Sequence, residues 1–388
     1  MNRLARVAEI PATDIGSLET PRLLLDRDRL EANCARMLVR AAALGVRLRP
    51  HLKTAKSLDV ARVATDPHDP AITVSTLKEA EWFARDGFRN ILLAACVVPQ
   101  KFAHAVRIQR ETGCDLMLVT DAVPVAQAAA EFATTNDVTL SFLIEIDCGE
   151  HRSGLPPADP GVVALARAIA ACPNLRLRGV MTHAGHSYAT NDPREVAAIA
   201  SVERDAAVTA AAAIRTAGLP CEIVSIGSTP TVLHVDHLDG VTEVRAGIYM
   251  VFDLAQLSRN MCRLDDIAVS VLASVIGHNR AGRAIILDAG ALALSKDIGA
   301  HRFLPGAGYG WVCDARRLAR LGNLAVDNVH QEHGTVAVDD DTWFERLPVG
   351  SLVRVLPNHA CITCAAYDVF DVVQGDAVAD RWERVNGW

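Results

Sequence analysis

The sequence of 388 residues has no long hydrophobic run and no excess of basic charge. Arg3 and Arg6 near the start are not followed by an apolar stretch, so neither a signal peptide nor a transmembrane span is predicted, and we expect a cytoplasmic protein. The formal net charge is -7, and acidic and basic residues are interspersed, which argues against a nucleic-acid partner and against a polybasic membrane anchor. We therefore expect a small-molecule partner.

A disulfide framework is also missing. The ten cysteines are scattered along a chain that is too long to need covalent cross-links, so they are expected to be mainly reduced thiols. Only Cys361 and Cys364 lie among polar residues that suggest a further role. There is no internal repeat or low-complexity segment, and 50% hydrophobic residues are enough for a large core, in one barrel plus a smaller domain or in two medium domains.

Short apolar runs alternate with longer amphipathic, alanine-rich stretches between about residues 46 and 250, as in repeated βα units. Four of the longer stretches have the spacing of helices: 77–86, 123–133, 161–171 and 196–217. The predicted strands are 46–52, 72–75, 91–96, 116–120, 141–147, 177–183, 222–226 and 243–248. Eight strands of similar character without an evident edge strand favour a closed (β/α)8 barrel, with an open doubly wound sheet as the alternative.

After about residue 265 the pattern changes to short strands separated by loops rich in Gly, Asp and Asn, which predicts a β-rich C-terminal domain. Its predicted strands are 268–276, 283–289, 335–338, 352–356 and 369–373. We assign residues 20–260 to the barrel, and residues 1–19 and 261–388 to the β-rich domain. Residues 20–30 have an alternative placement, because the early apolar run 23–26 can pair with the second domain.

Two lysines, Lys53 and Lys56, follow the first predicted barrel strand, at the face where barrel enzymes keep their active sites. A partly desolvated lysine there can form a Schiff base with an aldehyde cofactor, and Lys53 lies closer to the strand end. The alternative is that both are solvated loop charges.

Other polar segments also follow predicted barrel strands. Residues 227–231 (GSTPT) and 245–249 (RAGIY) offer small residues and hydroxyls that suit a phosphate, although such turns are also common in loops. Residues 147–154 and 182–188 bring titratable groups to the ends of the fifth and sixth strands. Ordinary helix caps and turns are the alternative for these two segments.

In the second domain, residues 357–361 (PNHAC) follow a predicted strand. If this segment is extended, His359 and Cys361 lie on one face, and an imidazole with a thiolate suits zinc or a similar metal. Two ligands leave positions open for water or substrate, as a catalytic metal requires. The alternative is a buried cysteine beside a hydrogen-bonded histidine, and Cys364, Asp368 and His333 are either supports for the ligands or bystanders.

Four motifs together resemble the D-serine dehydratase and D-threonine aldolase family, the fold-type III pyridoxal-phosphate (PLP) enzymes related to alanine racemase. They are residues 50–54 (PHLKT), 151–154 (HRSG), 227–231 (GSTPT) and 357–361 (PNHAC). The resemblance runs in order from about Thr20 to Trp388. Residues 72–80, 151–154 and 242–247 most resemble the members that dehydrate D-threo-3-hydroxyaspartate.

The resemblance implies a role for each matching residue. It implies that Lys53 carries PLP as a Schiff base and that His359 and Cys361 hold a divalent metal. It places Arg152 beside the cofactor hydroxyl and Arg245 against the pyridine nitrogen. The remaining residues expected to bind the cofactor are Ser75, Tyr188, Gly227, Ser228, Thr229, Gly247 and Ile248.

The resemblance also implies a reaction. A cation at the pyridine nitrogen weakens the electron sink, which favours prompt loss of a β leaving group. In this hypothesis the metal acts as a Lewis acid on the substrate hydroxyl, Lys53 removes the α-proton with Arg152 beside the cofactor, and the products are a 2-oxo acid and ammonia.

Two alternatives stay open. With His183 as base, the same site would break the Cα–Cβ bond and give glycine and an aldehyde, as in an aldolase. The His-x-Cys form of residues 359–361 resembles the dehydratases, whereas the aldolases tend to show His-x-Asp. The third reading is a non-catalytic PLP-binding protein, which the second domain argues against.

The substrate and the metal are not fixed by the sequence. D-serine, D-threonine and 3-hydroxyaspartate are all candidates, and a second carboxylate could meet Arg152, His301, Arg302 or Tyr309. Zinc is favoured by the thiolate, with manganese, cobalt and magnesium as alternatives. The family resemblance implies a homodimer in which the second domain of one chain completes the active site of the other.

Overall fold

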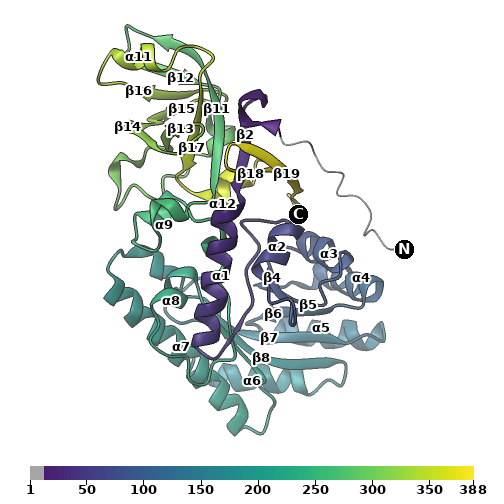
Figure 1. Cartoon of the computed structure of the whole chain (residues 1–388). Coiled ribbons are helices and arrows are strands. Elements are labelled where there is room, and N and C mark those ends of the chain that lie inside the picture. Colours follow the sequence, from purple (N-terminus) through teal and green to yellow (C-terminus); the bar gives the residue numbers. More distant parts are fainter. Residues whose placement is uncertain (1–12) are drawn as a thin grey trace. The chain divides into compact units, whose positions relative to one another are not determined.

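The computed structural model describes residues 13–388, so residues 1–12 of the predicted β-rich domain lie outside the described part. The chain divides into two compact units (Figure 1). The barrel unit comprises Cys34–Tyr249 and Gly387–Trp388, and the strand-rich unit comprises the residues up to Asn33 together with Met250–Asn386. One division falls within the helix α1 (Arg27–Ala43).

The barrel unit is built on eight parallel strands in the order β3-β10-β9-β8-β7-β6-β5-β4. The bridge between His51 and Thr73 joins the chain after β3 to β4. There, Leu52 N–H donates to Thr73 O (2.9 Å) and Thr73 N–H donates to Pro50 O (2.9 Å), so the ring of strands is nearly closed. The predicted (β/α)8 barrel is therefore confirmed over the open sheet. Its strands are β3 (Arg47–Leu48), β4 (Ala71–Val74), β5 (Asn90–Cys96), β6 (Asp115–Thr120), β7 (Leu140–Ile146), β8 (Leu175–Thr182), β9 (Ile223–Ile226) and β10 (Glu243–Val244).

The outer helices begin at polar residues that satisfy the first free amides of each helix. Thr76 accepts from Glu79 N–H at the start of α3, Asp159 from Gly161 N–H at the start of α6, and Asp192 from Arg194 N–H at the start of α7. The helices of this unit after α1 are α2 (Leu58–Ala64), α3 (Leu77–Arg85), α4 (Phe102–Thr112), α5 (Val123–Thr135), α6 (Pro160–Ala170), α7 (Pro193–Thr216) and α8 (Thr229–His234), with the short η2 (Pro99–Lys101), η3 (Gly185–Ala189) and η4 (Ile248–Met250). In the part of the chain that is described, no helix has the length and apolar character needed to cross a membrane.

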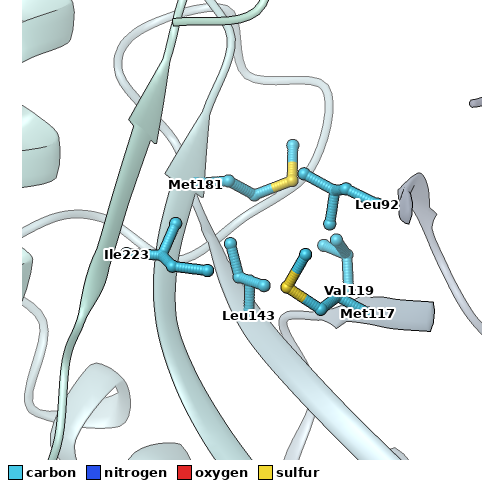
Figure 2. Packing of buried hydrophobic residues seen from close by; sticks show 6 residues of the cluster. All are labelled: Leu92, Met117, Val119, Leu143, Met181 and Ile223. Carbon is cyan, nitrogen blue, oxygen red and sulfur yellow. The ribbon is translucent and has the colours of Figure 1, made fainter. Parts of the chain in front are cut away.

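The buried side chains of the barrel strands form an apolar cluster and a polar cluster. The apolar cluster comprises Leu92, Met117, Val119, Leu143, Met181 and Ile223, all buried (Figure 2). Ser225 lies two residues after Ile223 on β9 and therefore points to the same side of the strand. It belongs to the polar cluster.

In the polar cluster, buried Arg49 donates two hydrogen bonds to buried Glu243, at 2.8 and 2.9 Å. Ser225 donates to the same carboxylate (2.7 Å), and Arg245 donates to Ser225 (2.7 Å). An unpaired buried charge would be costly, so the members of this network depend on one another. The network therefore connects the interior of the barrel to Arg245, which follows β10.

The strand-rich unit contains a sheet in the order β1-β19-β18-β2-β11-β12-β16-β15, and β17 pairs with β11 and β13, and β13 with β14. The predicted β-rich C-terminal domain is confirmed. Residues 20–30 were expected in the barrel, with pairing to the second domain as the alternative. The strand β2 pairs with β18, parallel, and with β11, antiparallel, so this part of the segment belongs to the sheet of the second domain. The strands are β1 (Thr13–Asp14), β2 (Arg22–Asp26), β11 (Val269–Asn279), β12 (Ala284–Leu287), β13 (Gly310–Asp314), β14 (Arg320–Ala325), β15 (Asn328–Val329), β16 (Gly334–Ala337), β17 (Leu352–Pro357), β18 (Val369–Gln374) and β19 (Ala377–Glu383).

Short helices connect these strands. They are α9 (Leu254–Leu257), α10 (Ala291–Leu294), α11 (Thr342–Arg346) and α12 (Ala360–Cys364), with η1 (Ile15–Ser17), η5 (Leu264–Asp266) and η6 (Pro305–Ala307). Among them, α12 carries Cys361 and begins directly after His359, so the candidate metal ligands lie at the end of β17.

Candidate active site

The predicted site residues of the barrel unit all follow the carboxyl ends of its strands. Lys53 follows the bridge at His51, His183 follows β8 directly, and Arg245 follows β10. Carboxyl ends of parallel strands meet at one end of a barrel, so these residues come from separate segments to one place. The others in this unit are Ser75 after β4, Arg152 after β7, Tyr188 in η3, Gly227, Ser228 and Thr229 after β9, and Gly247 and Ile248 after β10.

The two lysines that the sequence left open differ in their surroundings. Lys56 lies 3.2 Å from the buried carboxylate of Glu79. That carboxylate also accepts from Ser75 N–H (3.0 Å), so Lys56 and Ser75 share one anchor. Lys53 is exposed and forms no ion pair within residues 13–388. Of the two lysines, only Lys56 is therefore held by a carboxylate in the described chain.

Two neutral histidines lie beside Lys53. Burial lowers the pKa of His183 to about 3, and the charges of Lys53 and Arg245 add to this against the opposing bond to Gly227 O. Burial also holds the pKa of His51 well below its usual range, helped by the same two charges. Both imidazoles are therefore uncharged at neutral pH.

The proton on His183 can be placed. Its Nδ1 lies 3.0 Å from Gly227 O, and because a carbonyl oxygen only accepts, Nδ1 carries the hydrogen. Nε2 then keeps its lone pair and can accept a proton. The Nδ1 atom of His51 is buried and has no hydrogen-bond partner in the described chain, as expected of an atom that faces a ligand site.

Arg245 is buried and is held by neutral acceptors. It donates to Ser225 Oγ (2.7 Å) and to Thr182 O (2.6 Å). Burial lowers the pKa of this guanidinium, and the carboxylates of Glu243 and Glu203 oppose the shift. The guanidinium is therefore fixed in orientation without a direct carboxylate contact, which leaves it able to donate to a ligand.

The segments after β9 and β10 approach other backbone so closely that only glycine fits. A Cβ on Gly227, whose φ is 122°, would lie 2.8 Å from Arg245 O, and a Cβ on Gly247 would lie 2.5 Å from His51 O. Within residues 13–388 the amide N–H groups of Thr229, Gly247 and Ile248 donate to no protein acceptor. Amide N–H groups without a protein acceptor, next to glycines that lack a side chain, can bind a phosphate group. These segments therefore suit the phosphate of PLP.

Of the other cofactor candidates, Ser228 is buried and its hydroxyl lies 2.9 Å from Ser187 Oγ. Tyr188, in η3 beside Ser187, is half-buried. Arg152 is exposed, 3.5 Å from Glu150 and 3.9 Å from Glu145, and its charge contributes to the lowered pKa of His183.

Residues 357–361 are not extended, so the condition under which His359 and Cys361 would share one face of a strand is not met. β17 ends at Pro357, and α12 begins directly after His359. The chain turns because Asp253 accepts from Ala360 N–H (2.8 Å). Buried Asn358 also accepts from Ala300 N–H (2.9 Å) and donates to Gly308 O (2.7 Å). Cys361 nevertheless lies close enough to His359 to contribute to the raised pKa of the imidazole.

Asp297 orients the candidate metal ligand. Its Oδ2 lies 2.7 Å from His359 Nδ1, which leaves Nε2 for a metal, as is usual for ligating histidines. Burial opposes the charge on His359, but Asp297 and Cys361 together raise its pKa to about 11. No set of three or more His, Cys, Asp or Glu side chains is arranged for a metal in the described residues. An imidazole and a thiol two positions apart are ligand types that suit zinc or a similar metal.

Of the residues proposed to support the metal ligands, only Cys364 lies near Cys361. Cys364 is buried. Burial, and to a smaller extent the charge of Cys361, raises the pKa of the Cys364 thiol to about 12. Asp368 accepts from Asn386 (3.0 Å) instead, and His333 is exposed in the turn after β15. Asp253 and Asp297 were not predicted, because both lie far from residue 359 in the chain and no motif marks them.

Comparisons with known proteins agree with this geometry. The family model of the alanine racemase N-terminal domain matches residues 25–255, and that of the serine dehydratase domain matches residues 268–373. The chain is thus an alanine-racemase-type barrel followed by a dehydratase-type domain, a class of PLP-dependent lyases.

Individual relatives narrow the class. The D-threo-3-hydroxyaspartate dehydratase of Delftia sp. is 44% identical over 96% of this chain and 98% of that protein. The D-serine dehydratase of Dictyostelium discoideum is 29% identical over 94% and 95%, and the 3-hydroxy-D-aspartate aldolase of Paracoccus denitrificans is 29% identical over 97% and 94%. The chain belongs to the family of these dehydratases and aldolases, as the motifs predicted.

Among solved structures, the Delftia dehydratase has a TM-score of 0.93 at 42% identity, covering 97% of this chain and 100% of that one. It has also been solved as a histidine-to-alanine mutant and as a cysteine-to-alanine mutant in the metal-free form.

Proposed function

We propose that this chain is a PLP- and divalent-metal-dependent lyase that dehydrates D-threo-3-hydroxyaspartate or D-serine to a 2-oxo acid and ammonia. The observation that carries the proposal is the group of Lys53, His183 and Arg245 at the strand ends of a chain that is 44% identical to a D-threo-3-hydroxyaspartate dehydratase. An unpaired lysine, a neutral histidine and a buried guanidinium are the parts that α-proton chemistry on an amino acid needs.

The barrel residues would hold PLP. Lys53 would bind its aldehyde carbon, and the free amides of Thr229, Gly247 and Ile248, with Gly227 and the hydroxyl of Ser228, would bind its phosphate. Arg245 would face the ring nitrogen, and Ser75, Tyr188 and Arg152 would line the remaining sides. When bound, PLP supplies an electron sink that lowers the energy needed to remove the α-proton of the substrate.

The protein groups around the cofactor determine the course of the reaction. In this proposal Lys53 moves the α-proton, because it is the lysine without an ion-pair partner in the described chain. Arg245 offers hydrogen bonds but no transferable proton, since its guanidinium stays charged. A site that stabilises negative charge only partly favours prompt loss of a β leaving group, which is a dehydration.

His359 and Cys361 would bind the metal, which would supply a Lewis acid for the β-hydroxyl. The orientation of His359 by Asp297 supports this, and so does the Delftia dehydratase, in which a histidine and a cysteine two positions apart were the mutated residues and the cysteine mutant is metal-free. A thiolate favours zinc, and manganese, cobalt and magnesium are the alternatives.

Retro-aldol cleavage to glycine and an aldehyde is the second candidate. His183 favours it, because its Nε2 is unprotonated and could take the proton of a β-hydroxyl. The identity to an aldolase that acts on 3-hydroxy-D-aspartate is 29%, against 44% for the dehydratase, which places dehydration first.

We further propose a homodimer in which the strand-rich unit of one chain completes the site of the other, as the family resemblance implies. Gel filtration that gave a monomer at the assay concentration would contradict this. The cytoplasmic location stays a prediction from the sequence.

The test is an end-product assay on protein loaded with PLP and zinc, with D-threo-3-hydroxyaspartate, D-serine and D-threonine as substrates. We expect ammonia and a 2-oxo acid in equal amounts. Glycine and an aldehyde would establish the aldolase instead, and an inert protein that binds PLP would leave a carrier. Lys53→Ala should abolish product formation, whereas the matched control Lys56→Ala, which removes the lysine bound to Glu79, should retain it.

A further inference from the structure

One buried carboxylate joins two of the segments that carry the site. Glu203 lies within α7 and has an exposed fraction of 0%. Its Oε1 accepts from Ala184 N–H (2.8 Å), shortly after β8, and from Gly227 N–H (3.0 Å), directly after β9. A single oxygen atom of an outer helix therefore fixes the exits of two neighbouring strands.

These bonds form a closed ring with His183. Gly227 donates its N–H to Glu203 and accepts from His183 Nδ1 through its carbonyl. His183 is followed by Ala184, whose N–H returns to Glu203. The ring fixes the plane of the imidazole and keeps the hydrogen on Nδ1, so Nε2 is left as the proton acceptor.

The helix does not need this carboxyl group for packing. The buried residues of α7 around it include Ala200, Ala207 and Ala210, which pack with small apolar side chains. Burying a carboxyl group is unfavourable, and Oε2 of Glu203 has no hydrogen-bond partner in the described chain. Burial accordingly raises the pKa of Glu203. An unfavourable group with two short bonds to site segments indicates a role in the site.

We propose that Glu203 is a positioning residue, which holds His183 and the phosphate-binding turn 227–229 in register with each other. The inference rests on the proposed function, because it takes that turn as the phosphate site and His183 as a group beside the substrate. Glu203 would contact neither the phosphate nor the substrate; it acts through the backbone amides of Ala184 and Gly227.

The test compares two variants of the full-length protein. Glu203→Gln keeps an acceptor oxygen at the same distance from the backbone, and Glu203→Leu keeps the size but removes both bonds. We expect E203Q to bind PLP within about threefold of the wild type, and E203L to bind it about ten- to a hundredfold more weakly, since two bonds to an acidic acceptor are lost. For the residual holoenzyme, we expect kcat of E203L to fall and KM to change little. The measurements are PLP titration by absorbance and steady-state kinetics.

Ile214→Ala is the matched control, because Ile214 is a buried residue of the same helix and contributes packing alone. This variant should lower the melting temperature without weakening PLP binding. The inference is overturned if E203L binds PLP no more weakly than I214A, or if E203Q is as impaired as E203L. Should E203L fail to fold, Glu203→Asp, which withdraws the carboxylate by one methylene, must show the same loss. A wild-type chain that bound no PLP would refute the proposed function together with the inference.

Discussion

Removal of the carboxylate that orients His359 is the sharpest test of the candidate metal centre. The bond between Asp297 Oδ2 and His359 Nδ1 is 2.7 Å long, and the two side chains are 35% and 32% exposed. A hydrogen bond to a charged group contributes about 1.5–3 kcal/mol, and partial exposure places this one near the lower end. Loss of such a bond weakens metal binding about ten- to a hundredfold, or about 1.4–2.8 kcal/mol. We expect Asp297→Ala to fall in this range.

The assay is a competition titration of the metal-free protein with zinc and a chelator of known affinity. Asp297→Asn should lie between the wild type and Asp297→Ala, because its amide oxygen still accepts from Nδ1 but carries no charge. Asp314→Ala is the control, since Asp314 is a half-buried carboxylate of the same unit that accepts from Arg316 N–H and Arg317 N–H. Equal zinc affinity for the Asp297 and Asp314 variants would refute the role of Asp297.

The barrel unit gives three further predictions. Because the pKa of His183 is depressed from 6.5 to about 3, the unfolded chain binds this proton below pH 6.5 and the folded chain does not. The free energy of unfolding should thus fall on acidification by about 1.4 kcal/mol per pH unit, and His183→Asn should flatten the curve in urea melts at about pH 7 and about pH 5. Gly247→Ala places a Cβ 2.5 Å from His51 O. It should therefore weaken PLP binding at least about tenfold in an absorbance titration and lower the free energy of unfolding by about 1–3 kcal/mol. An affinity for PLP equal to that of the wild type would contradict the close approach. Arg49→Met removes both guanidinium bonds of buried Glu243 and leaves it Arg47, at 3.9 Å, and Ser225, so it should cost near the lower end of about 3–5 kcal/mol in a denaturant melt. Adding Glu243→Leu should partly restore the stability, and no recovery in the double variant would argue against the ion pair.

The barrel could be predicted from the sequence because its strands are buried on both faces. Every residue of β4 and β7 is buried, and such strands leave continuous apolar runs that are easy to count. The ends were less clear. β10 comprises only Glu243–Val244, whereas residues 243–248 were predicted, since the chain leaves the ladder where Gly247 passes close to His51.

The strand-rich unit was predicted less completely. The strands β1, β13, β14, β15 and β19 were not predicted. β14 contains Gly322 and Asn323, both unfavourable in strands, and β19 carries Asp380 and Arg381 in its middle. β13 pairs with β17, which is distant in the chain and leaves no local pattern. β14, β15 and β19 each pair with a strand that is next to them in the chain, so for these the weak signal lies in their own polar and glycine residues.

Site residues divided in the same way. Lys53, His183 and Arg245 follow strands and belong to motifs, so the sequence pointed to them. Glu203 and Asp297 act on residues that are distant in the chain, through bonds to a backbone amide or a ring nitrogen. A single acidic residue within a helix or a loop is usually solvated, so nothing in the sequence separates these two from the others.

The two bonds of Asn358 have a consequence for how new substrate preferences could arise. Its amide group fastens Ala300 at one end of a loop and Gly308 at the other, next to His359. An exposed residue between these anchors, such as Arg302, is expected to be exchangeable without displacing the imidazole, because Asn358 holds both ends of the loop. Mutation could therefore sample new side chains on this loop while the frame that carries the metal ligands stays intact, a separation that makes a scaffold evolvable.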